Sequence, residues 1–102
     1  MENHANESQI EKTLRILIEE YIKNKDAYLK TYEFMQRGQH FVGHRAPARI
    51  SELSLQYGNM VDIDTSERTY KYRFKGEDVK MFFDYLPDNF KKIIKSYKQI
   101  YA

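Results

Sequence analysis

The sequence contains no cysteine and no tryptophan, and its 102 residues include only two prolines and four glycines. Without cysteine the chain has no disulfide, no thiolate nucleophile and no cysteine-type zinc site, so we predict a cytoplasmic location. The hydrophobic runs are short, and none approaches the roughly 18 apolar residues that a membrane-spanning helix requires. The first eight residues are polar and lack the apolar stretch of a secretory signal. We therefore expect no membrane among the partners.

The composition is that of a folded protein, with 41% hydrophobic and 31% charged residues. A chain of 102 residues is long enough for one modest core, and we predict a disordered tail over 1–8 and a single domain over 9–102. The net charge of +2 is too small to indicate a polyanionic partner by itself. Residues 67–102, however, carry nine Lys and Arg against five Asp and Glu, so the positive charge is concentrated there.

The spacing of apolar residues near the start predicts a helix that begins with a capping box formed by Ser8 and Glu11. Glu11 and Arg15 are expected to pair on its exposed side. Its buried face is expected to consist of Ile10, Leu14, Leu17, Ile18, Tyr21 and Ile22. We predict one long helix over 9–36, bent near residue 25. A short strand over 28–35 is the alternative, because Tyr28, Tyr32 and Phe34 share a parity.

A loop over 38–48 is expected to lead into three consecutive strands, over 53–57, 61–64 and 70–75. Although ISELSLQYG at first resembles a helix, its apolar residues alternate, which is typical of a strand. A hairpin with Gly58 and Asn59 in its loop would connect the first two strands. In the second hairpin, Val61 is expected opposite Tyr72 and Ile63 opposite Tyr70. The apolar face of this sheet would consist of Leu53, Leu55, Tyr57, Val61, Ile63, Tyr70, Tyr72 and Phe74.

Two helices are predicted to follow and to cover that apolar face. In the first, over 77–86, the buried stripe consists of Val79, Phe82, Phe83 and Leu86. Pro87 ends this helix, and Asp88 is expected to cap a second helix over 88–101. Its apolar side consists of Phe90, Ile93, Ile94, Tyr97 and Tyr101. The predicted fold class is α+β, in the order α-β-β-β-α-α, with the helices on one face of a three-stranded antiparallel sheet.

No residue pattern in the sequence indicates catalysis or a cofactor. There is no glycine-rich phosphate loop, no nucleophile-elbow serine and no Cys/His pair, so we expect a protein that is not an enzyme. His40 and His44 stand four residues apart and on a helix would present two imidazoles to a metal. Nearby glycines favour a loop, and no metal site is predicted. These histidines, with Arg45 and Arg49, are candidates for a small polar binding loop, but Pro47 between the two arginines favours a plain surface loop.

The first functional hypothesis is a non-enzymatic interaction protein that binds a protein partner or itself. The nine tyrosines exceed what a core of this size is expected to bury, and tyrosines are effective interface anchors. The candidate partner-binding residues are Tyr28, Tyr32, Tyr85 and Tyr101.

The alternative is a nucleic-acid-binding protein that uses a basic sheet face and a basic C-terminal helix. In TYKYRFKG the aromatic residues fall on one face of the predicted strand and the cations on the other. We interpret the aromatics as core residues. For the cations we favour a solvated face with salt pairs, and a phosphate-binding face is the alternative. The candidate contacts are Lys71, Arg73, Lys75, Lys91, Lys92, Lys95 and Lys98.

Overall fold

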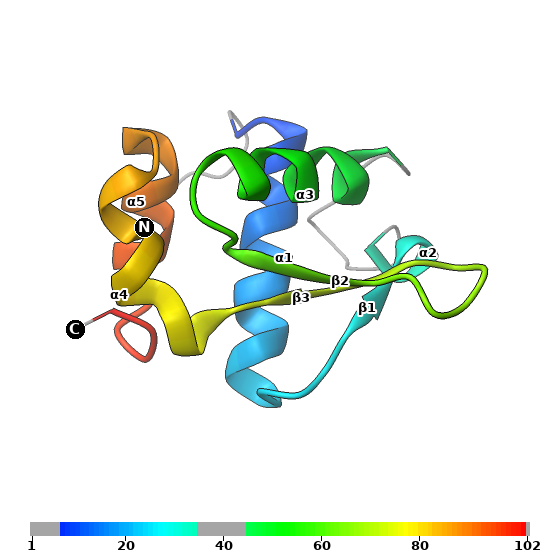
Figure 1. The fold of residues 1–102 in the computed structure, drawn as a ribbon. Helices are drawn as coiled ribbons and strands as arrows, with labels where there is room; N and C mark the ends of the chain where they lie inside the picture. Colours follow the sequence, from blue (N-terminus) through cyan, green and yellow to red (C-terminus); the bar gives the residue numbers. More distant parts are fainter. Residues whose placement is uncertain (1–6, 35–44, 102) are drawn as a thin grey trace.

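Three short antiparallel strands lie in the order β1-β3-β2 and are packed against helices (Figure 1). The computed structural model describes residues 7–34 and 45–101. The elements are α1 (Gln9–Lys23), β1 (Leu29–Lys30), α2 (Thr31–Phe34), α3 (Ala46–Gln56), β2 (Val61–Asp64), β3 (Lys71–Phe74), α4 (Val79–Phe82) and α5 (Asp88–Lys95). Short 3-10 turns, η1 (Gly76–Asp78) and η2 (Phe83–Tyr85), flank α4. This α+β architecture confirms the predicted fold class.

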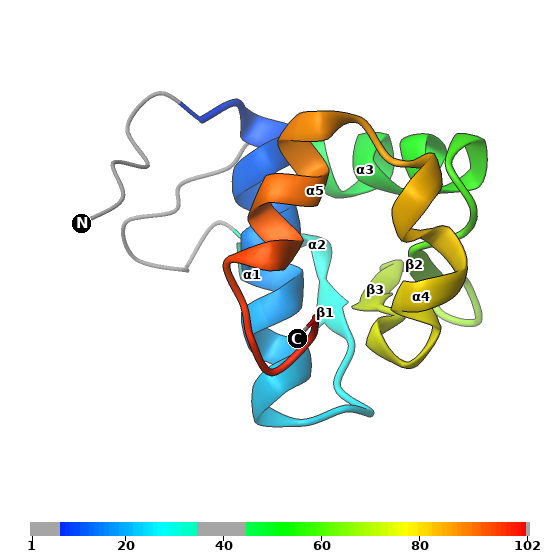
Figure 2. The same ribbon diagram turned by 90° about the vertical axis from the view of Figure 1, so that its left-hand side faces the viewer.

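The core lies between the sheet and α1, which runs behind the strands in Figure 1 and beside them in Figure 2. From β3, Phe74 is fully buried and makes edge-to-face ring contacts with Tyr21 of α1 and Phe82 of α4. The other buried hydrophobic residues include Leu14, Leu17, Ile18, Leu29, Phe34, Ile50, Met60, Val61, Tyr72, Ile93 and Ile94. The polar side chains of β2 and β3 lie on the opposite side, so one face of the sheet is covered by helices.

The first helix begins as predicted and ends earlier than predicted. Ser8 Oγ accepts from the Glu11 N–H, and the Glu11 carboxylate accepts from the Ser8 N–H, which completes the capping box. The helix stops at Lys23 because Asn24 is extended and its side-chain oxygen accepts from the Asp26 N–H, a turn that competes with helix. The prediction of one helix over 9–36 is therefore wrong, and the strand alternative is confirmed only for Leu29 and Lys30.

The first strand of the predicted meander is a helix. Residues 53–57, expected to be extended, form the end of α3 and its C-cap, and the third strand of the sheet is instead β1. The alternation of Leu53, Leu55 and Tyr57 indicated a strand with one buried face. Leu55 is in fact 74% exposed, so the alternation does not reflect burial. Gly58 and Asn59, with φ of 107° and 63°, form the turn from α3 into β2 rather than a hairpin loop.

The β2–β3 hairpin is confirmed with a different register. Val61 lies opposite Phe74 and Ile63 opposite Tyr72, so each partner is displaced by two residues from the prediction. The displacement of two keeps every side chain on its predicted face. Tyr72 is buried as expected. Ile63 is 38% exposed, and Tyr70 lies beyond the strand and is 46% exposed, which corrects the assignment of both residues to the core.

The C-terminal helical region agrees with the prediction in its buried stripe. All four predicted residues over 77–86 are buried, although the segment consists of η1, α4 and η2 rather than one continuous helix. Pro87, not Asp88, occupies the N-cap position of α5. The helix ends at Lys95, six residues before the predicted end, and Tyr97 and Tyr101 pack against the core from the segment after it.

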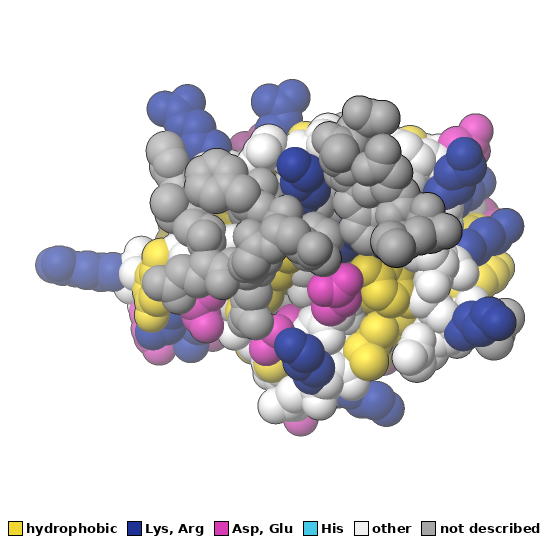
Figure 3. All heavy atoms as spheres, turned by 180° about the vertical axis from the view of Figure 1, so that it is seen from behind, with side chains coloured by type: hydrophobic (Ala, Val, Ile, Leu, Met, Phe, Trp, Pro, Cys, Tyr) yellow, Lys and Arg dark blue, Asp and Glu magenta, His cyan; other side chains and the backbone are white. Residues whose placement is uncertain are grey.

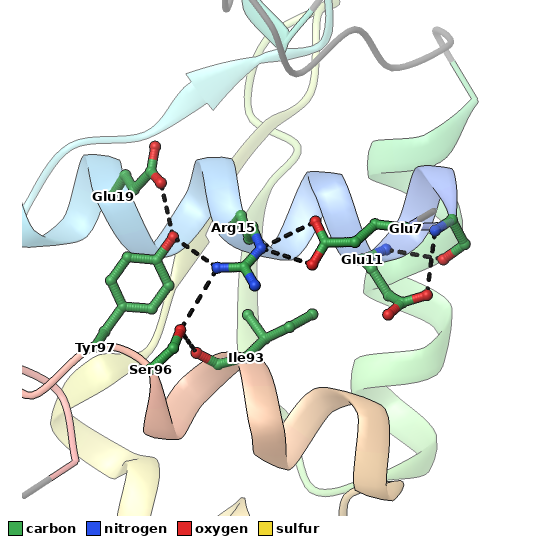
Figure 4. Close-up of polar contacts among 8 residues, drawn as sticks. Glu7, Glu11, Arg15, Glu19, Ile93, Ser96 and Tyr97 are labelled. Atoms are coloured by element: carbon green, nitrogen blue, oxygen red, sulfur yellow. Dashed lines mark hydrogen bonds and ion pairs between the residues drawn. The ribbon is translucent and has the colours of Figure 1, made fainter. Parts of the chain in front are cut away.

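A buried arginine connects α1 to the segment after α5 (Figure 4). Arg15 is only 2% exposed, whereas the sequence predicted it on the outer side of the helix. Its Nε donates to the Glu7 carboxylate over 2.7 Å, and its Nη1 donates to the Tyr97 hydroxyl over 3.3 Å. Burial by itself lowers the pKa of the guanidinium, but the hydrogen bonds with Glu7 and Tyr97 raise it above its ordinary value. Arg15 therefore remains charged inside the protein.

Candidate nucleic-acid interface

Carboxylates neutralise the predicted cations of the sheet. Lys71 Nζ lies 3.1 Å from Glu67 Oε1 and 3.8 Å from Asp64 Oδ2. Arg73 forms a two-point contact with Glu77, at 2.7 and 3.1 Å. Lys75 Nζ lies 3.5 Å from Asp78 Oδ2.

Hydrogen bonds in two of these contacts shift the pKa values of Arg73, Glu77 and Lys71. The hydrogen bond with Glu77 raises the pKa of Arg73, and the same bond lowers the pKa of the Glu77 carboxyl. The hydrogen bond with Glu67 raises the pKa of Lys71. The guanidinium of Arg73 also lies 5.8 Å from the ring centre of Tyr28. The mixed-sign sheet face is thus internally paired, which leaves little net attraction for phosphate.

The four predicted lysines of the C-terminal region carry no ion pair with the residues that the structure describes. Lys91 and Lys95 of α5 place their Nζ atoms 5.9 and 5.6 Å from the ring centre of Phe83. Lys92, Lys95 and Lys98 are exposed. This basic side of α5 belongs to a different part of the molecule from the sheet cations, since α4 and α5 lie together at the left-hand end in Figure 1.

The four candidate partner-binding tyrosines lie in different environments. Tyr85 is 71% exposed and Tyr32 is 52% exposed. Tyr28 is half-buried and donates to Asp62 Oδ2 over 2.6 Å, a bond that raises the pKa of its hydroxyl. Tyr101 stacks on Phe83, with ring centres 4.2 Å apart. Of these four, Tyr32 and Tyr85 thus offer a largely free ring surface.

Helix α3 presents an outward-facing side that the sequence did not reveal. Arg45, at its N-cap, and Arg49 stand four residues apart and are exposed, and both line a depression of about 370 Å³ between α3 and the residues Ser8 to Ile10 at the start of α1. In the described part of the chain neither forms an ion pair. The remaining exposed side chains of α3 are those of Ala48, Glu52, Leu55 and Gln56. We call this set, Arg45 included, the outer face of α3.

The inner face of α3 is held firmly against α1 and the sheet. Ile50 and Ser54 are fully buried, and the N-terminal turn contains Pro47, which favours helix initiation. Ser54 Oγ accepts a buried hydrogen bond of 2.7 Å from the Val61 N–H, and its carbonyl accepts from the Asn59 N–H. These bonds link the end of α3 to the start of β2, so the orientation of the outer face is set by the fold.

The turn between β2 and β3 extends from the body of the molecule on the same side as the first turn of α3, at the right in Figure 1. Asp64 opens this turn by accepting from the Ser66 N–H over 2.9 Å, and hydrogen bonding by Ser66 lowers the pKa of the Asp64 carboxyl. Arg68 is exposed and has no ion pair with another described residue. The exposed cation Arg68 therefore belongs to a turn that lies on the same side of the molecule as the start of α3.

On the face seen from behind, lysine and arginine side chains lie around the edges rather than together in one patch. Figure 3, which views the protein from behind, shows them along the upper edge and at both ends, with acidic side chains between them. Cations without a carboxylate partner in the described ranges therefore identify the candidate surface better than the total charge does. Arg45, Arg49 and Arg68 are three such cations on one side.

Sequence reasoning found Arg45 and Arg49 but assigned them to a loop, and it missed Glu52, Gln56 and Arg68. The available signal was the helical spacing of Ile50, Ser54 and Tyr57 after Pro47. The helical pattern is hard to recognise in the sequence because the buried stripe of α3 contains a polar residue, Ser54, where an apolar residue is expected. His40 and His44 lie outside the described residues.

No group of three or more potential metal ligands exists among the residues that the structure describes. No helix in those same residues is long and apolar enough to cross a membrane. The chain matches no family model, no curated protein and no solved structure. Its function must therefore be argued from the geometry alone.

Proposed function

We propose that this protein binds duplex DNA, with the outer face of α3 in the major groove and the β2–β3 turn against the adjacent backbone. The observation that carries the proposal is the contrast between the two sides of α3. Its inner side is fixed to α1 and β2, while its outer side exposes Arg45 and Arg49 without ion-pair partners among the described residues. The major groove of B-DNA, about 12 Å wide, admits an α-helix of this kind.

The connectivity supports this assignment. In the order α1-β1-α2-α3-β2-β3, with the strands arranged β1-β3-β2, helix α3 leads directly into the β2–β3 hairpin, so the helix and the hairpin turn form one continuous segment. In helix–turn–helix proteins the second helix of the motif enters the major groove with its N-terminal residues near the bases. Connectivity alone does not confer function, so the argument rests on the exposed side chains of α3 and of the turn. A role of this kind is non-enzymatic and agrees with the predicted cytoplasmic location.

Three arginines supply the attraction to phosphate. Arg45 and Arg49 stand at the start of α3, and Arg68 stands in the turn. Each phosphate neutralised by such a cation releases counterions, so binding weakens as salt increases. Lys71, Arg73 and Lys75 contribute less to this attraction because each is paired with a carboxylate.

The test measures duplex binding by fluorescence anisotropy at several salt concentrations. We expect Arg45→Gln combined with Arg49→Gln to weaken binding to all duplexes. The slope of log K against log salt should also fall by roughly 0.9 for each phosphate that is no longer neutralised. Lys23→Gln is the matched control, since Lys23 is an exposed cation at the far end of α1. A-form RNA duplexes should compete poorly, because their deep, narrow major groove excludes a helix.

Three results would count against the proposal. The first is the absence of duplex binding at low salt. The second is an equal loss of binding for the Lys23→Gln control. The third is a loss confined to a variant with Lys91, Lys92, Lys95 and Lys98 changed to glutamine, which would move the interface to α5.

A second candidate function, binding to a protein partner or to another copy of this chain, is favoured by one observation. Met81 is 74% exposed and Tyr85 is 71% exposed, and they stand four residues apart through α4 and η2. Other hydrophobic residues of this segment, Phe82, Phe83 and Leu86, are buried, so Met81 and Tyr85 are its exposed apolar side chains. Large exposed side chains of this type are effective interface anchors.

Sedimentation and light scattering test the second candidate. A stable oligomer that dissociates in the Met81→Ser, Tyr85→Ser double variant would support self-association through this surface. Ile22→Ser is the control, since Ile22 is 36% exposed rather than buried as predicted, and it should leave the oligomer intact. If the protein is a monomer at all concentrations, self-association is excluded. Binding of the same variants to a partner captured by the wild-type protein then tests whether Met81 and Tyr85 contact that partner.

A further inference from the structure

A carboxylate stands at the centre of the outer face of α3. Glu52 lies one helical turn after Ala48 and Arg49 and one turn before Leu55 and Gln56, and these residues of the outer face are all solvent-accessible. In the described part of the chain Glu52 forms no ion pair and no side-chain hydrogen bond. Within these residues its charge is therefore not used to stabilise the fold.

A carboxylate on the binding face opposes attraction to phosphate. If α3 bound DNA only through the backbone, Glu52 would weaken the complex by repulsion and offer nothing in return. The edges of the bases supply an alternative partner, because cytosine presents its N4 amino group in the major groove as a hydrogen-bond donor. A glutamate can accept that bond, whereas it cannot donate to the acceptors of guanine or to a phosphate oxygen.

Arg49 provides the complementary chemistry three residues earlier on the same side. A guanidinium donates to O6 and N7 of guanine, which is the commonest specific contact in the major groove. Three residues of helix rise by about 4.5 Å, which is close to the rise of about 3.4 Å between successive base pairs. Arg49 and Glu52 are thus spaced to reach the same or neighbouring pairs.

We propose that α3 makes binding sequence-specific for a G·C-containing site, with Arg49 donating to guanine and Glu52 accepting from cytosine N4. This inference rests on the proposed function. It adds the class of DNA sequence that is recognised and names Glu52 as the residue that selects it. Repulsion between Glu52 and phosphate weakens binding to every duplex. Only a site that offers a cytosine N4 amino group to Glu52 compensates for that loss, so the protein discriminates between sequences.

The experiment is selection from a random duplex library, followed by affinity measurements on the selected site and on a site with the cytosine replaced. We expect wild-type protein to enrich a site with a G·C step and to discriminate roughly fivefold or more against the replacement. Glu52→Gln should lose the cytosine preference, because a glutamine amide pairs with adenine instead. It should also bind unselected duplexes more tightly than the wild-type protein, because the repulsion is removed. Asp84→Asn, which removes an exposed carboxylate outside α3, should change neither property.

The outcomes separate this inference from the proposed function. If Glu52→Gln binds DNA and enriches the same site as the wild-type protein, the role of Glu52 is overturned and DNA binding stands. If the wild-type protein binds duplexes but enriches no sequence, sequence-specific recognition is overturned. If no duplex is bound at all by a protein whose circular dichroism shows it to be folded, both proposals fail.

Discussion

The Tyr97 hydroxyl donates a hydrogen bond to Glu19 Oε2 over 2.7 Å, which joins the segment after α5 to the middle of α1 (Figure 4). The same hydroxyl accepts from Arg15, which in turn binds Glu7. This network crosses the interface between the first and last helices. Because it is largely shielded from water, its energetic contribution depends on every member having a partner.

We expect Arg15→Met to lower the free energy of unfolding by about 3 kcal/mol, since it leaves the Glu7 carboxylate shielded from solvent without its counter-ion. Adding Glu7→Gln should recover part of that loss, so the two changes will be non-additive. Urea denaturation of the single and double variants measures the coupling. Lys12→Met, on a less buried side of α1, should change stability by no more than about 0.5 kcal/mol. Strict additivity would show that the ion pair contributes nothing.

The pH dependence of stability should carry a contribution from Tyr97. Burial raises the pKa of its hydroxyl to about 12, and the hydrogen bond to Glu19 acts in the same direction. The ordinary value in an unfolded chain is about 10. A raised pKa means that the stabilisation is present in full below about pH 10 and is lost as the pH rises through about 12.

Tyr97→Phe isolates this effect, because the remaining tyrosines are common to both proteins. The stability advantage of the wild-type protein over the variant should be largest near about pH 9 and should shrink at higher pH. Denaturation curves at several pH values supply the difference. An advantage that stays constant to about pH 11.5 would contradict the assigned pKa.

Two serines on the buried side of α3 should respond in opposite ways to substitution by alanine. Ser51 Oγ is buried without a hydrogen-bond partner among the described residues, so Ser51→Ala should be neutral or stabilising by up to about 1 kcal/mol. Ser54→Ala removes the acceptor of the Val61 N–H and should cost about 1 to 3 kcal/mol. Thermal or urea denaturation compares the two directly. Equal effects would mean that the hydrogen bond to Val61 does not hold α3 in place.

The turn from α3 into β2 should require glycine at residue 58. Gly58 has a φ of 107°, and a Cβ added there would lie 3.0 Å from Phe82 Cβ. Gly58→Ala should therefore cost about 1 to 3 kcal/mol, through backbone strain and displacement of Phe82. Asn59→Gly is the control, since its φ of 63° suits glycine, and it should shift stability by less than about 1 kcal/mol. If Gly58→Ala leaves stability unchanged, residue 58 does not adopt the positive φ on which this prediction depends.

Local sequence was sufficient for the start of α1, for the buried stripe after β3 and for the faces of β2 and β3. The capping box of Ser8 and Glu11 determines the start of α1, and the buried stripe from Val79 to Leu86 was predicted in full. The parity of β2 and β3 was also correct, because alternation fixes which face a side chain occupies even when the register differs. The end of α1 is also encoded locally, because the Asn24 side chain accepts from the Asp26 N–H.

The interface was less predictable because its helix depends on distant contacts. In α3, Leu55 is exposed and Ser54 is buried, the reverse of what hydrophobicity indicates. Ser54 is accepted in the core only because Val61, on another element, donates to it. Hydrophobic alternation therefore indicates a strand, and the sequence gives no indication that Arg45 and Arg49 lie on a helix.

What the sequence by itself determined is the class of the protein: one small α+β domain, its first helix cap and the faces of its strands, because these follow from spacing along the chain. The tertiary structure alone decided that β1 completes the sheet, that Arg15 is buried with Glu7 and Tyr97, and that α3 turns its charged side outward. These features depend on pairing between residues far apart in sequence, and pairing energy is not visible in the periodicity of either partner alone.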